Sequence, residues 1–293
     1  MTAMTISREE GTLPTVRGAA FLQTSRRKIS LVRPLVMAIL NVTPDSFSDG
    51  GAYLSIDDAL RRAEKMIADG ADILDIGGES TRPGSKRVSA GDEIGRVLPV
   101  IEAISKRFDT PISTDTTKSE VAKRSIDAGA EIINDISGLR FDEKIADVAA
   151  ETGAGLVLMH SRGTFETMHS QPPVVDVFAE IGSDFRRSIE IAGSYGVSAE
   201  QIALDIGLGF GKTFEQNLEL LAKLDKIVSD FKSYPILVGA SRKSFIGKLL
   251  GGVPPHQRVD ASVEAALNAV RKGALIVRVH DVAETVAALD QVA

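Results

Sequence analysis

Side chains that can bind polar ligands follow short apolar segments at eight places in this 293-residue sequence. Carboxylates accept hydrogen bonds, the cations of lysine and arginine donate them, and asparagine and histidine can do either. Gathered in one place, such groups would recognise a ligand with a fixed row of donors and acceptors, and the cations would hold an anionic part of it. The groups are Asn41, residues 75–79, Asp115, Asn134 with Asp135, His160, Asp205, residues 241–243, and Arg278 with His280.

The apolar segments before these groups predict eight buried strands. They cover residues 35–40, 73–76, 111–113, 131–133, 155–159, 201–204, 236–238 and 275–277. Between them lie amphipathic stretches with apolar residues at helical spacing, at 56–69, 92–107, 118–128, 142–151 and 214–230. Several stretches end in a glycine that suits a helix C-cap, at Gly70, Gly129 and Gly273.

Continuous apolar strands joined by helices are typical of a parallel sheet covered by helices. Eight such units predict an α/β protein with a single (β/α)8 TIM barrel over residues 35–293, and an N-terminal extension, 1–34, that packs on it. In this fold the carboxyl ends of all strands meet at one mouth, so the eight polar groups come together. A doubly wound sheet would instead gather its ligands at one switch point.

Composition limits the classes of function. With 34 basic and 40 acidic residues the net charge is −6, which argues against nucleic acid as a partner. The sequence has no apolar run long enough for a transmembrane helix, and its first thirty residues lack the apolar stretch of a signal peptide. The absence of cysteine excludes disulfides, thiolate catalysis and cysteine-based zinc sites. We expect a cytoplasmic protein that binds small molecules.

Eight motifs surround the predicted strand ends: NVTPDSFSDGG (41–51), DIGGESTRPGS (75–85), STDTTKSEV (113–121), INDISG (133–138), LMH (158–160), GFGK (209–212), GASRKSFIG (239–247) and RVHDV (278–282). In this order they resemble the dihydropteroate synthase family, and they span nearly the whole barrel. The resemblance implies a transferase of folate biosynthesis. It would join (7,8-dihydropterin-6-yl)methyl diphosphate to 4-aminobenzoate and release diphosphate, with Mg²⁺ as cofactor. A homodimer and sulfonamide binding are implied as well.

Four of the strand-end residues suit the pterin ring: Asp115, Asn134, Asp205 and Lys243. A pterin presents an amide and an amino-pyrimidine edge, so carboxylates can accept from its N–H groups and a cation can donate to its carbonyl. Taken singly, Asp115 could cap the helix near Lys118, and Asp205 could simply turn the chain. The convergence of all four favours binding. The resemblance adds catalytic roles for Asp115 and Lys243 and a substrate contact for Phe210.

The diphosphate needs cations in this acidic protein. Arg278 and His280 alternate at the end of the eighth strand, so both can face the mouth of the barrel. The resemblance implies that this pair holds the diphosphate and that Asn41 binds Mg²⁺ through its amide oxygen, while the loop after Asn41 closes over the site. Mg²⁺ takes few protein ligands, so a single asparagine suffices. Alternatively, Asn41 is a turn residue before Thr-Pro.

Loop 77–91 carries four glycines and predicts a mobile lid. By resemblance, its Thr81 contacts the pterin diphosphate, and its Arg82 stabilises the charge of the leaving group. Ser244 begins a helix whose N-terminus suits the carboxylate of aminobenzoate. Alternatively, Ser244 is only an N-cap.

Two other patterns carry little functional meaning. Residues 209–213, GFGKT, look like the end of a phosphate-binding P-loop, but Ile206 stands where that motif needs glycine. Lys212 is then an ordinary loop cation. His160, His169 and His256 lack metal-ligand spacing, so we expect no zinc site.

The chain also departs from the family pattern. Ile206 replaces a proline after Asp205, residues 161–165 replace the usual methionine and proline, and Ala261 with Ser262 replace a Gly-Ser pair. These changes leave every proposed ligand in place. They bear on the aminobenzoate side of the site and on sulfonamide sensitivity.

Two other functions fit a pterin-binding barrel. One is an inactive paralogue that carries or senses pterins, and the other is a methyltetrahydrofolate–corrinoid methyltransferase. The methyltransferase has no diphosphate to hold, whereas Arg278 and His280 are present here, and an inactive binder would have lost a residue such as Arg82. For the synthase we expect SN1-like displacement, because the arylamine is a weak nucleophile and the sequence supplies cations for the leaving group.

Overall fold

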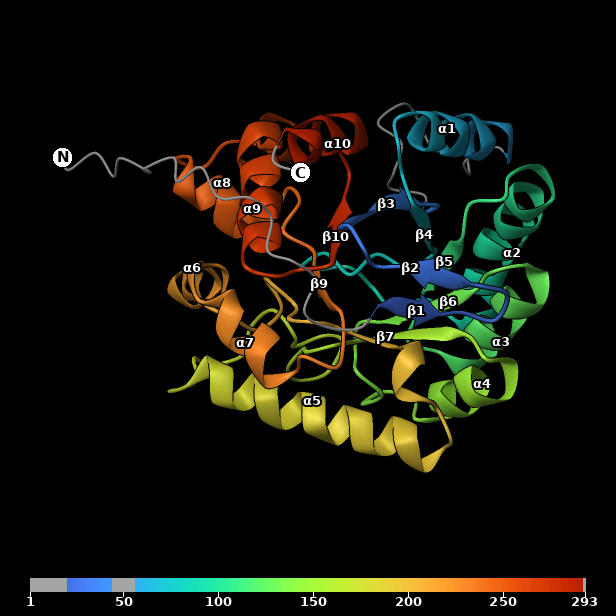
Figure 1. Ribbon diagram of the computed structural model, residues 1–293, viewed down its shortest axis with the longest axis horizontal. Coiled ribbons are helices and arrows are strands. Elements are labelled where there is room, and N and C mark those ends of the chain that lie inside the picture. Colours follow the sequence, from blue (N-terminus) through green and yellow to red (C-terminus); the bar gives the residue numbers. More distant parts are fainter. Residues whose placement is uncertain (1–19, 44–55, 292–293) are drawn as a thin grey trace.

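The computed structural model describes residues 20–43 and 56–291 and confirms the predicted (β/α)8 barrel (Figure 1). Eight parallel strands pair in chain order, and the last pairs with both its predecessor and the first, which closes the sheet. The strands are β3 (Leu35–Asn41), β4 (Ile73–Gly77), β5 (Ile112–Asp115), β6 (Ile132–Asp135), β7 (Gly155–Met159), β8 (Ile202–Asp205), β9 (Ile236–Val238) and β10 (Ile276–Val279).

The strand ends differ from the prediction by one or two residues, and the shift matters for the site. β5 and β8 end on Asp115 and Asp205, and β10 includes Arg278, whereas the prediction placed these residues just beyond the strands. Successive side chains of a regular strand point to opposite faces. The barrel itself therefore sets the directions of these three side chains.

Helices surround the barrel in chain order (Figure 1). Among the described residues no helix has the length and apolar character needed to cross a membrane. The helices are α1 (Ile56–Ala68), α2 (Ala90–Arg107), α3 (Ser119–Ala128), α4 (Lys144–Thr152), α5 (Val177–Ser194), α6 (Phe214–Ala222), α7 (Leu224–Asp230), α8 (Ser244–Leu249), α9 (Val259–Arg271) and α10 (Val282–Asp290), with short 3₁₀ helices η2 (Ala199–Gln201) and η3 (Pro255–Gln257).

The main hydrophobic core lies between the sheet and the helices. On α1, Ala59 and Ala63 are fully buried four residues apart and pack in one cluster with Val36, Ala38 and Leu40 of β3. Two alanines on one helical face let the helix approach the sheet closely. A larger residue at Ala63 would overpack this contact, at a cost of about 1–3 kcal/mol.

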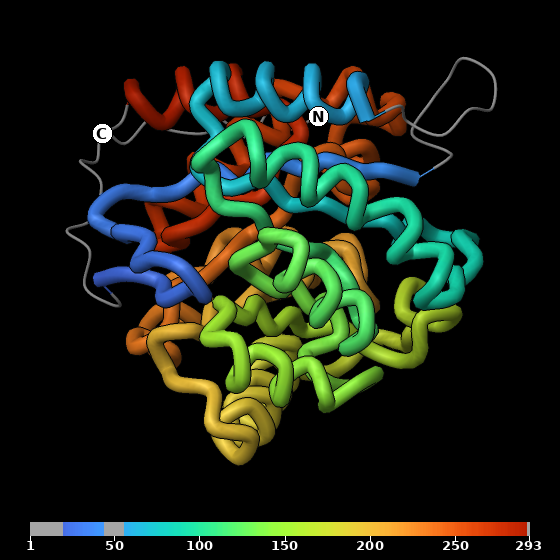
Figure 2. Tube along the Cα trace, turned by 90° about the vertical axis from the view of Figure 1, so that its right-hand side faces the viewer, coloured from blue at the N-terminus to red at the C-terminus, as the bar shows by residue number. Residues whose placement is uncertain are grey.

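A short hairpin closes the end of the barrel opposite the site (Figure 2). Its antiparallel strands, β1 (Phe21–Gln23) and β2 (Lys28–Ser30), are each too short to show a sequence pattern, and they were not anticipated. Fully buried Leu22 and Leu31 pack against the residues inside the barrel, which covers its amino-terminal end. The division at residue 34 stays a prediction, and residues 1–19 lie outside the described part of the chain.

The single helix predicted over 214–230 is wrong, because two helices, α6 and α7, meet at Lys223. The backbone of Lys223 leaves the helical region, with φ −123° and ψ 29°. Leu220, Leu224 and Ile227 are nevertheless all buried. The apolar spacing continues across the break, so periodicity alone does not reveal it.

Candidate active site

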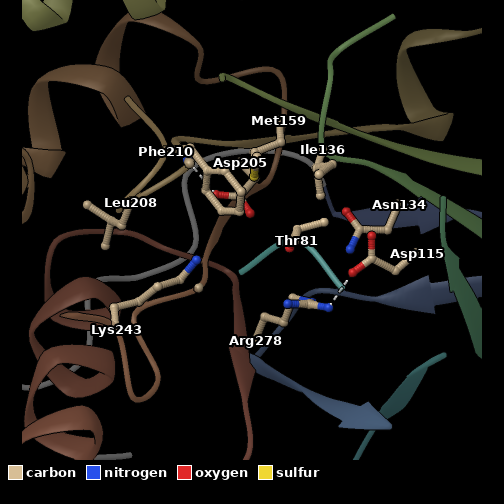
Figure 3. A pocket seen from close by; sticks show the side chains of 12 residues that line it. Thr81, Asp115, Asn134, Ile136, Met159, Asp205, Leu208, Phe210, Lys243 and Arg278 are labelled. Atoms are coloured by element: carbon tan, nitrogen blue, oxygen red, sulfur yellow. Dashed lines mark hydrogen bonds and ion pairs between the residues drawn. The ribbon is translucent and has the colours of Figure 1, made fainter. Parts of the chain in front are cut away.

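A cavity opens at the carboxyl ends of the barrel strands, opposite the end that the hairpin covers. Figure 3 shows the side chains that line it. Seven of the residues predicted to bind substrate or act in catalysis line it, together with apolar residues and two glycines. The lining residues are Thr81, Asp115, Asn134, Ile136, Met159, Asp205, Gly207, Leu208, Phe210, Gly239, Lys243 and Arg278.

An ion-paired arginine crosses the floor of this cavity. Arg278 of β10 donates through Nε to Asp75 Oδ2 of β4 and through Nη2 to Asp115 Oδ2 of β5, both at 2.6 Å. Asp75 Oδ2 also accepts from Asn134 Nδ2 at 3.1 Å. The alternative for Asp115 is wrong, since Lys118 is the N-cap of α3 and the first N–H of the helix, that of Ser119, donates to Asp142 Oδ2 at 2.8 Å. Asp115 instead orients a cation toward the cavity.

Asn134 leaves an acceptor free for a ligand. Its Nδ2 is used by Asp75, while its Oδ1 is buried and has no hydrogen-bond partner among the described residues. A buried acceptor without a partner costs about 1–3 kcal/mol. A ligand that brings an N–H group to this oxygen would remove that cost, so the structure favours a donor at this point of the cavity.

Burial controls the charges around the cavity. It raises the pKa of Asp115 to about 7, against the attraction of Arg278. It lowers the pKa of Lys243 to about 8, and the positive charge of Arg278 acts in the same direction. For Arg278 burial acts to lower the pKa, but Asp75 and Asp115 together raise it, so this side chain is a permanent cation. At neutral pH the cavity therefore combines a fixed cation with groups close to their titration points.

The opposite wall is built by the loop after β8. Asp205 accepts from the backbone N–H of Gly207 at 2.7 Å through Oδ1, so it turns the chain and lines the cavity at the same time. Lys243 Nζ lies 4.2 Å from the centre of the Phe210 ring, a cation–π contact. Carboxylate, ammonium and aromatic ring thus meet on one side of the cavity (Figure 3).

An apolar cluster joins the loops after β6, β7 and β8. It contains Ile136, Met159, Phe165, Met168 and Phe210, all buried. Three of these residues also line the cavity. One side of the cavity is therefore apolar and the other polar, which suits a flat heterocycle with one edge of donors and acceptors.

Asn41 lies at the end of β3 rather than in a turn, which excludes the alternative for this residue. A Cβ added at Gly77 would stand 3.5 Å from Asn41 Oδ1 and 3.7 Å from Asp115 Oδ2. The glycine thus keeps open a space between two side-chain oxygen atoms at the strand ends. The loop predicted to close over the site, residues 44–51, lies outside the described residues.

Two predicted ligands lie next to the cavity and do not line it. His280 Nδ1 is 3.0 Å from Ser241 Oγ, and burial, followed by the charge of Arg278, lowers the pKa of His280 to about 3. Ser244 is exposed and is the first residue of α8, whose N-cap is Lys243. The N-cap alternative for Ser244 is therefore wrong. The roles of His280 toward diphosphate and of Ser244 toward aminobenzoate stay predictions.

The loop between β4 and α2 is tied at its base. Glu79 accepts the backbone N–H of Val88 at 2.6 Å and an ion pair from Lys118 Nζ at 3.0 Å. Lys118 also pairs with buried Glu93 of α2 at 2.5 Å. The loop is shorter than predicted, because α2 begins at residue 90. These contacts join both ends of the loop, and its motion as a lid stays a prediction.

The tip of this loop touches the loop after β7. His169 Nε2 lies 2.7 Å from the carbonyl oxygen of Thr81, and the imidazole packs 5.2 Å from the Phe210 ring. Thr81 lines the cavity, whereas Arg82 is exposed. His169 thus joins two walls of the cavity. No sequence pattern predicted this contact.

Lys212 is not the ordinary loop cation that was predicted. It is partly buried, and its Nζ lies 2.8 Å from His160 Nδ1 and 2.7 Å from the carbonyl oxygen of Gly207. Burial lowers its pKa to about 7.

In the described residues no group of three His, Cys, Asp or Glu side chains could hold a metal ion.

The departures from the family pattern are accommodated in the core of the loops. Ser161 Oγ donates to the carbonyl of Ile136 at 2.7 Å and accepts from Arg140 Nη2 at 2.7 Å. Phe165 joins the apolar cluster, and Ile206 is fully buried between sheet and helices. Ser161 and Phe165 therefore contact the cavity only indirectly, by packing or hydrogen bonding to the loops that carry Ile136 and Phe210.

Sequence reasoning missed the partners of the predicted residues. Asp75 was placed at a strand end but given no role, although it holds Arg278 and Asn134. Met159 and Leu208 line the cavity and carry no chemical pattern in the sequence. The position of Asp75 inside a strand that is otherwise apolar was the feature that could have revealed it.

Comparison with known proteins agrees with this geometry. Residues 37–280 match the model of a family described as pterin binding enzyme. A dihydropteroate synthase of Escherichia coli K12 is 48% identical over 263 residues, which is 89% of this chain and 91% of the relative. A Yersinia pestis dihydropteroate synthase structure with a sulfonamide drug complex superposes with a TM-score of 0.87 and 46% identity, over 93% of this chain and 98% of the other.

A Burkholderia cenocepacia dihydropteroate synthase complexed with 7,8-dihydropteroate superposes with a TM-score of 0.84 and 46% identity, over 93% of this chain and 95% of the other. Identity of this extent over nearly the full length of each protein confirms the resemblance first found in the strand-end motifs. The chain therefore belongs to the pterin-binding enzyme family and, within it, to the dihydropteroate synthases.

Proposed function

We propose that this protein condenses (7,8-dihydropterin-6-yl)methyl diphosphate with 4-aminobenzoate to 7,8-dihydropteroate and diphosphate. The observation that carries the proposal is the cavity at the barrel mouth, where the free acceptor of Asn134 lies among Asp115, Asp205 and Lys243. This set matches the donors and the carbonyl of a pterin edge. The relatives named dihydropteroate synthase support the same activity.

In this proposal, different residues of the cavity bind different parts of the pterin diphosphate. Asn134 Oδ1 and the Asp205 carboxylate accept hydrogen bonds from the ring, and Lys243 donates to it. Arg278 lies at the floor, held by Asp75 and Asp115, and offers its remaining N–H donors to phosphate oxygens. Phe210 and Met159 supply an apolar surface for the ring. Together these contacts orient the methylene carbon and keep the leaving group beside a cation.

We propose Asn41 as the protein ligand of Mg²⁺. The space that Gly77 leaves between Asn41 Oδ1 and Asp115 Oδ2 offers oxygen atoms, which Mg²⁺ prefers, and Mg²⁺ commonly takes few protein ligands beside phosphate and water. When bound, the ion would neutralise charge on the diphosphate. Asn41→Ala should weaken Mg²⁺ binding, measured by titration calorimetry with the pterin diphosphate present. Unchanged Mg²⁺ affinity would refute this assignment.

The displacement is SN1-like in this proposal. The bond from the methylene carbon to the diphosphate oxygen breaks first and its electron pair leaves with the diphosphate. The amine lone pair then forms the C–N bond, and the amine releases a proton to water. Arg278, a permanent cation, favours early departure of the leaving group. A large secondary isotope effect at the methylene carbon is expected, and an effect near unity would indicate associative attack.

We further propose a cytoplasmic homodimer that binds sulfonamides. Sequence resemblance supports the dimer, the lack of cysteine fits a reducing compartment, and the Yersinia pestis enzyme complexed with a sulfonamide drug supports the drug site. Light scattering, cell fractionation and inhibition of product formation test these three points separately.

One assay separates the synthase from the alternatives. The full-length protein is incubated with the pterin diphosphate and Mg²⁺, with and without 4-aminobenzoate, and diphosphate and dihydropteroate are measured. The synthase forms both products when aminobenzoate is present, whereas a pterin carrier forms neither. Asp205→Asn should keep the fold but weaken pterin binding by about 1–3 kcal/mol, because a pterin donor loses its acceptor. A pterin affinity unchanged in this variant would remove Asp205 from the site.

A further inference from the structure

We infer that Lys212 is a positioning residue for the reaction proposed above: its side-chain nitrogen holds the Gly207–Phe210 turn in the shape that presents Asp205 and Phe210 to the substrate cavity. The inference rests on the proposed function. Lys212 does not line the cavity itself. It lies behind the wall that the turn forms, so any effect on the substrate passes through the turn.

The nitrogen of Lys212 faces a set of acceptors that belongs to this turn. Nζ donates to the carbonyl oxygens of Gly207 at 2.7 Å and Phe210 at 3.2 Å, which are the first and last residues of the turn. Its third acceptor is His160 Nδ1 at 2.8 Å. A fourth acceptor, the carbonyl oxygen of His160, lies at 3.5 Å, so the nitrogen has at least as many acceptors around it as it has N–H donors. An apolar side chain at this position would leave the carbonyl oxygen of Phe210 and His160 Nδ1 without this donor, while the carbonyl oxygen of Gly207 would keep the backbone N–H of Phe210 at 3.1 Å.

His160 provides Lys212 with a hydrogen-bond acceptor whose position is fixed by the barrel. Its side chain is fully buried, its pKa lies well below the ordinary value because of burial, and it is therefore neutral. Since Nδ1 accepts from Lys212, the ring proton must lie on Nε2, which faces Asp184 Oδ2 at 3.5 Å. His160 is also bound to β8 through its backbone N–H, which donates to the carbonyl of Asp205 at 2.9 Å. Lys212 is thus held against a rigid part of the barrel.

The turn cannot keep its position by sterics alone. Gly207 has φ +62°, and a Cβ on it would stand 1.9 Å from the carbonyl oxygen of His160, so the backbone here packs directly on β7. Gly209 and Gly211 also have positive φ, 82° and 65°. Three glycines in five residues give the loop many alternative conformations in the absence of a tether. Lys212 selects one of them together with Asn217 Oδ1, which accepts the N–H of Gly209 at 2.7 Å, and Arg162 Nη1, which donates to the carbonyl oxygen of Gly211 at 3.0 Å. Of these three groups, only Lys212 contacts both ends of the turn, Gly207 and Phe210.

Two cavity residues depend on this selection. The backbone N–H of Gly207 orients the Asp205 carboxylate at 2.7 Å, and the ring of Phe210 lies under Lys243 Nζ. If the Gly207–Phe210 turn moves, the carboxylate of Asp205 and the ring of Phe210 move with it. Lys212 therefore acts on substrate affinity without contacting substrate.

Lys212→Met tests this with a side chain of similar length that has no donor. The barrel should remain folded, and amide hydrogen exchange over residues 206–211 should become faster. Affinity for the pterin diphosphate should fall roughly tenfold or more, as expected for the loss of buried hydrogen bonds. The matched control is Lys223→Met, since Lys223 is half-exposed between α6 and α7 and pairs only with Glu219 at 2.7 Å among the described residues. This control should change neither quantity.

His160 variants separate positioning from general destabilisation. His160→Asn keeps an acceptor near the Nδ1 position and should retain most of the pterin affinity, whereas His160→Leu should lose it. Lys212→Met combined with His160→Leu should be no weaker than Lys212→Met alone, because both remove the same interaction. Additive losses, or a lowered melting temperature with unchanged affinity, would show a merely structural role.

Hydrogen exchange is measured on the ligand-free protein and so does not depend on the proposed reaction. If the wild-type protein forms no dihydropteroate, the proposed function fails, while faster exchange in Lys212→Met still supports the tether. Unchanged exchange over 206–211 together with wild-type pterin affinity would overturn the inference.

Discussion

Asp75→Asn removes the negative charge that holds Arg278 across the floor of the cavity. Asp75 is fully buried in β4, and its Oδ2 accepts from Arg278 Nε at 2.6 Å and from Asn134 Nδ2 at 3.1 Å. The amide has the same shape as the carboxylate and keeps one acceptor oxygen. The substitution therefore tests the charge of Asp75 with little change in packing.

The expected loss of stability follows from three contributions. Breaking a buried ion pair by removing one partner costs about 3–5 kcal/mol. Arg278 keeps Asp115 at 2.6 Å, which places the cost at the lower end. Asp75 Oδ1 is buried and has no hydrogen-bond partner among the described residues, and the amide nitrogen that takes its place in the variant has none either, so this atom adds little to the difference. We expect a net loss of about 3 kcal/mol in the free energy of unfolding.

The assay is urea unfolding of the variant beside wild type, with titration of the pterin diphosphate on both. Pterin affinity should fall as well, because Arg278 and Asn134 both lose a fixed partner. Asp127→Asn is the control, since Lys123 and Asp127 form an ion pair at 2.8 Å in which both side chains are about half exposed. Exposed pairs contribute little. The control should therefore leave stability and affinity unchanged.

Two results would refute this reasoning. If Asp75→Asn unfolds at the same urea concentration as wild type, the buried pair does not hold β4 to β10. If stability falls but pterin affinity is unchanged, Asp75 stabilises the barrel without orienting the site.

Three further predictions concern the loops and the pH dependence. Arg82→Ala should lower kcat with little change in pterin affinity, because this exposed residue acts once the loop has closed; a loss of affinity with normal single-turnover chemistry would contradict it. His169→Phe keeps an aromatic ring against Phe210 but loses the N–H that donates to the carbonyl oxygen of Thr81, so kcat/KM should fall. His169→Gln keeps a donor and should recover part of this loss. Equal steady-state rates in the two variants would show that the hydrogen bond to Thr81 does not matter for the reaction. Burial lowers the pKa of Lys212 from 10.5 to about 7, so between these pH values the unfolded chain holds a proton that the folded protein has released, and stability rises with pH. Lys212→Met should reduce that slope by at most about 1.4 kcal/mol per pH unit in urea unfolding between pH 7 and 10, and an unchanged slope would show that Lys212 does not titrate in this range.

The amino-acid sequence determined the barrel and most of the cavity, because both follow from local patterns. Apolar runs and helical spacing predict the eight strands, and a closed parallel sheet brings all strand ends to one mouth. Because the strand ends meet at one mouth, their places along the chain were enough to predict that four residues lie together: Asp115, Asn134, Asp205 and Arg278. Lys243 was found in the same way.

The tertiary structure decided which of these residues touch and what lies behind them. Asp75 and Arg278 are 203 positions apart, and their pairing depends on the barrel closing between β10 and β3. The direction of Lys212 depends on His160, which belongs to another strand end. The break at Lys223 leaves the apolar spacing unchanged, so the sequence carries no mark of it. Contacts between distant segments depend on how whole elements pack, and periodicity along the chain records only the face that each element buries.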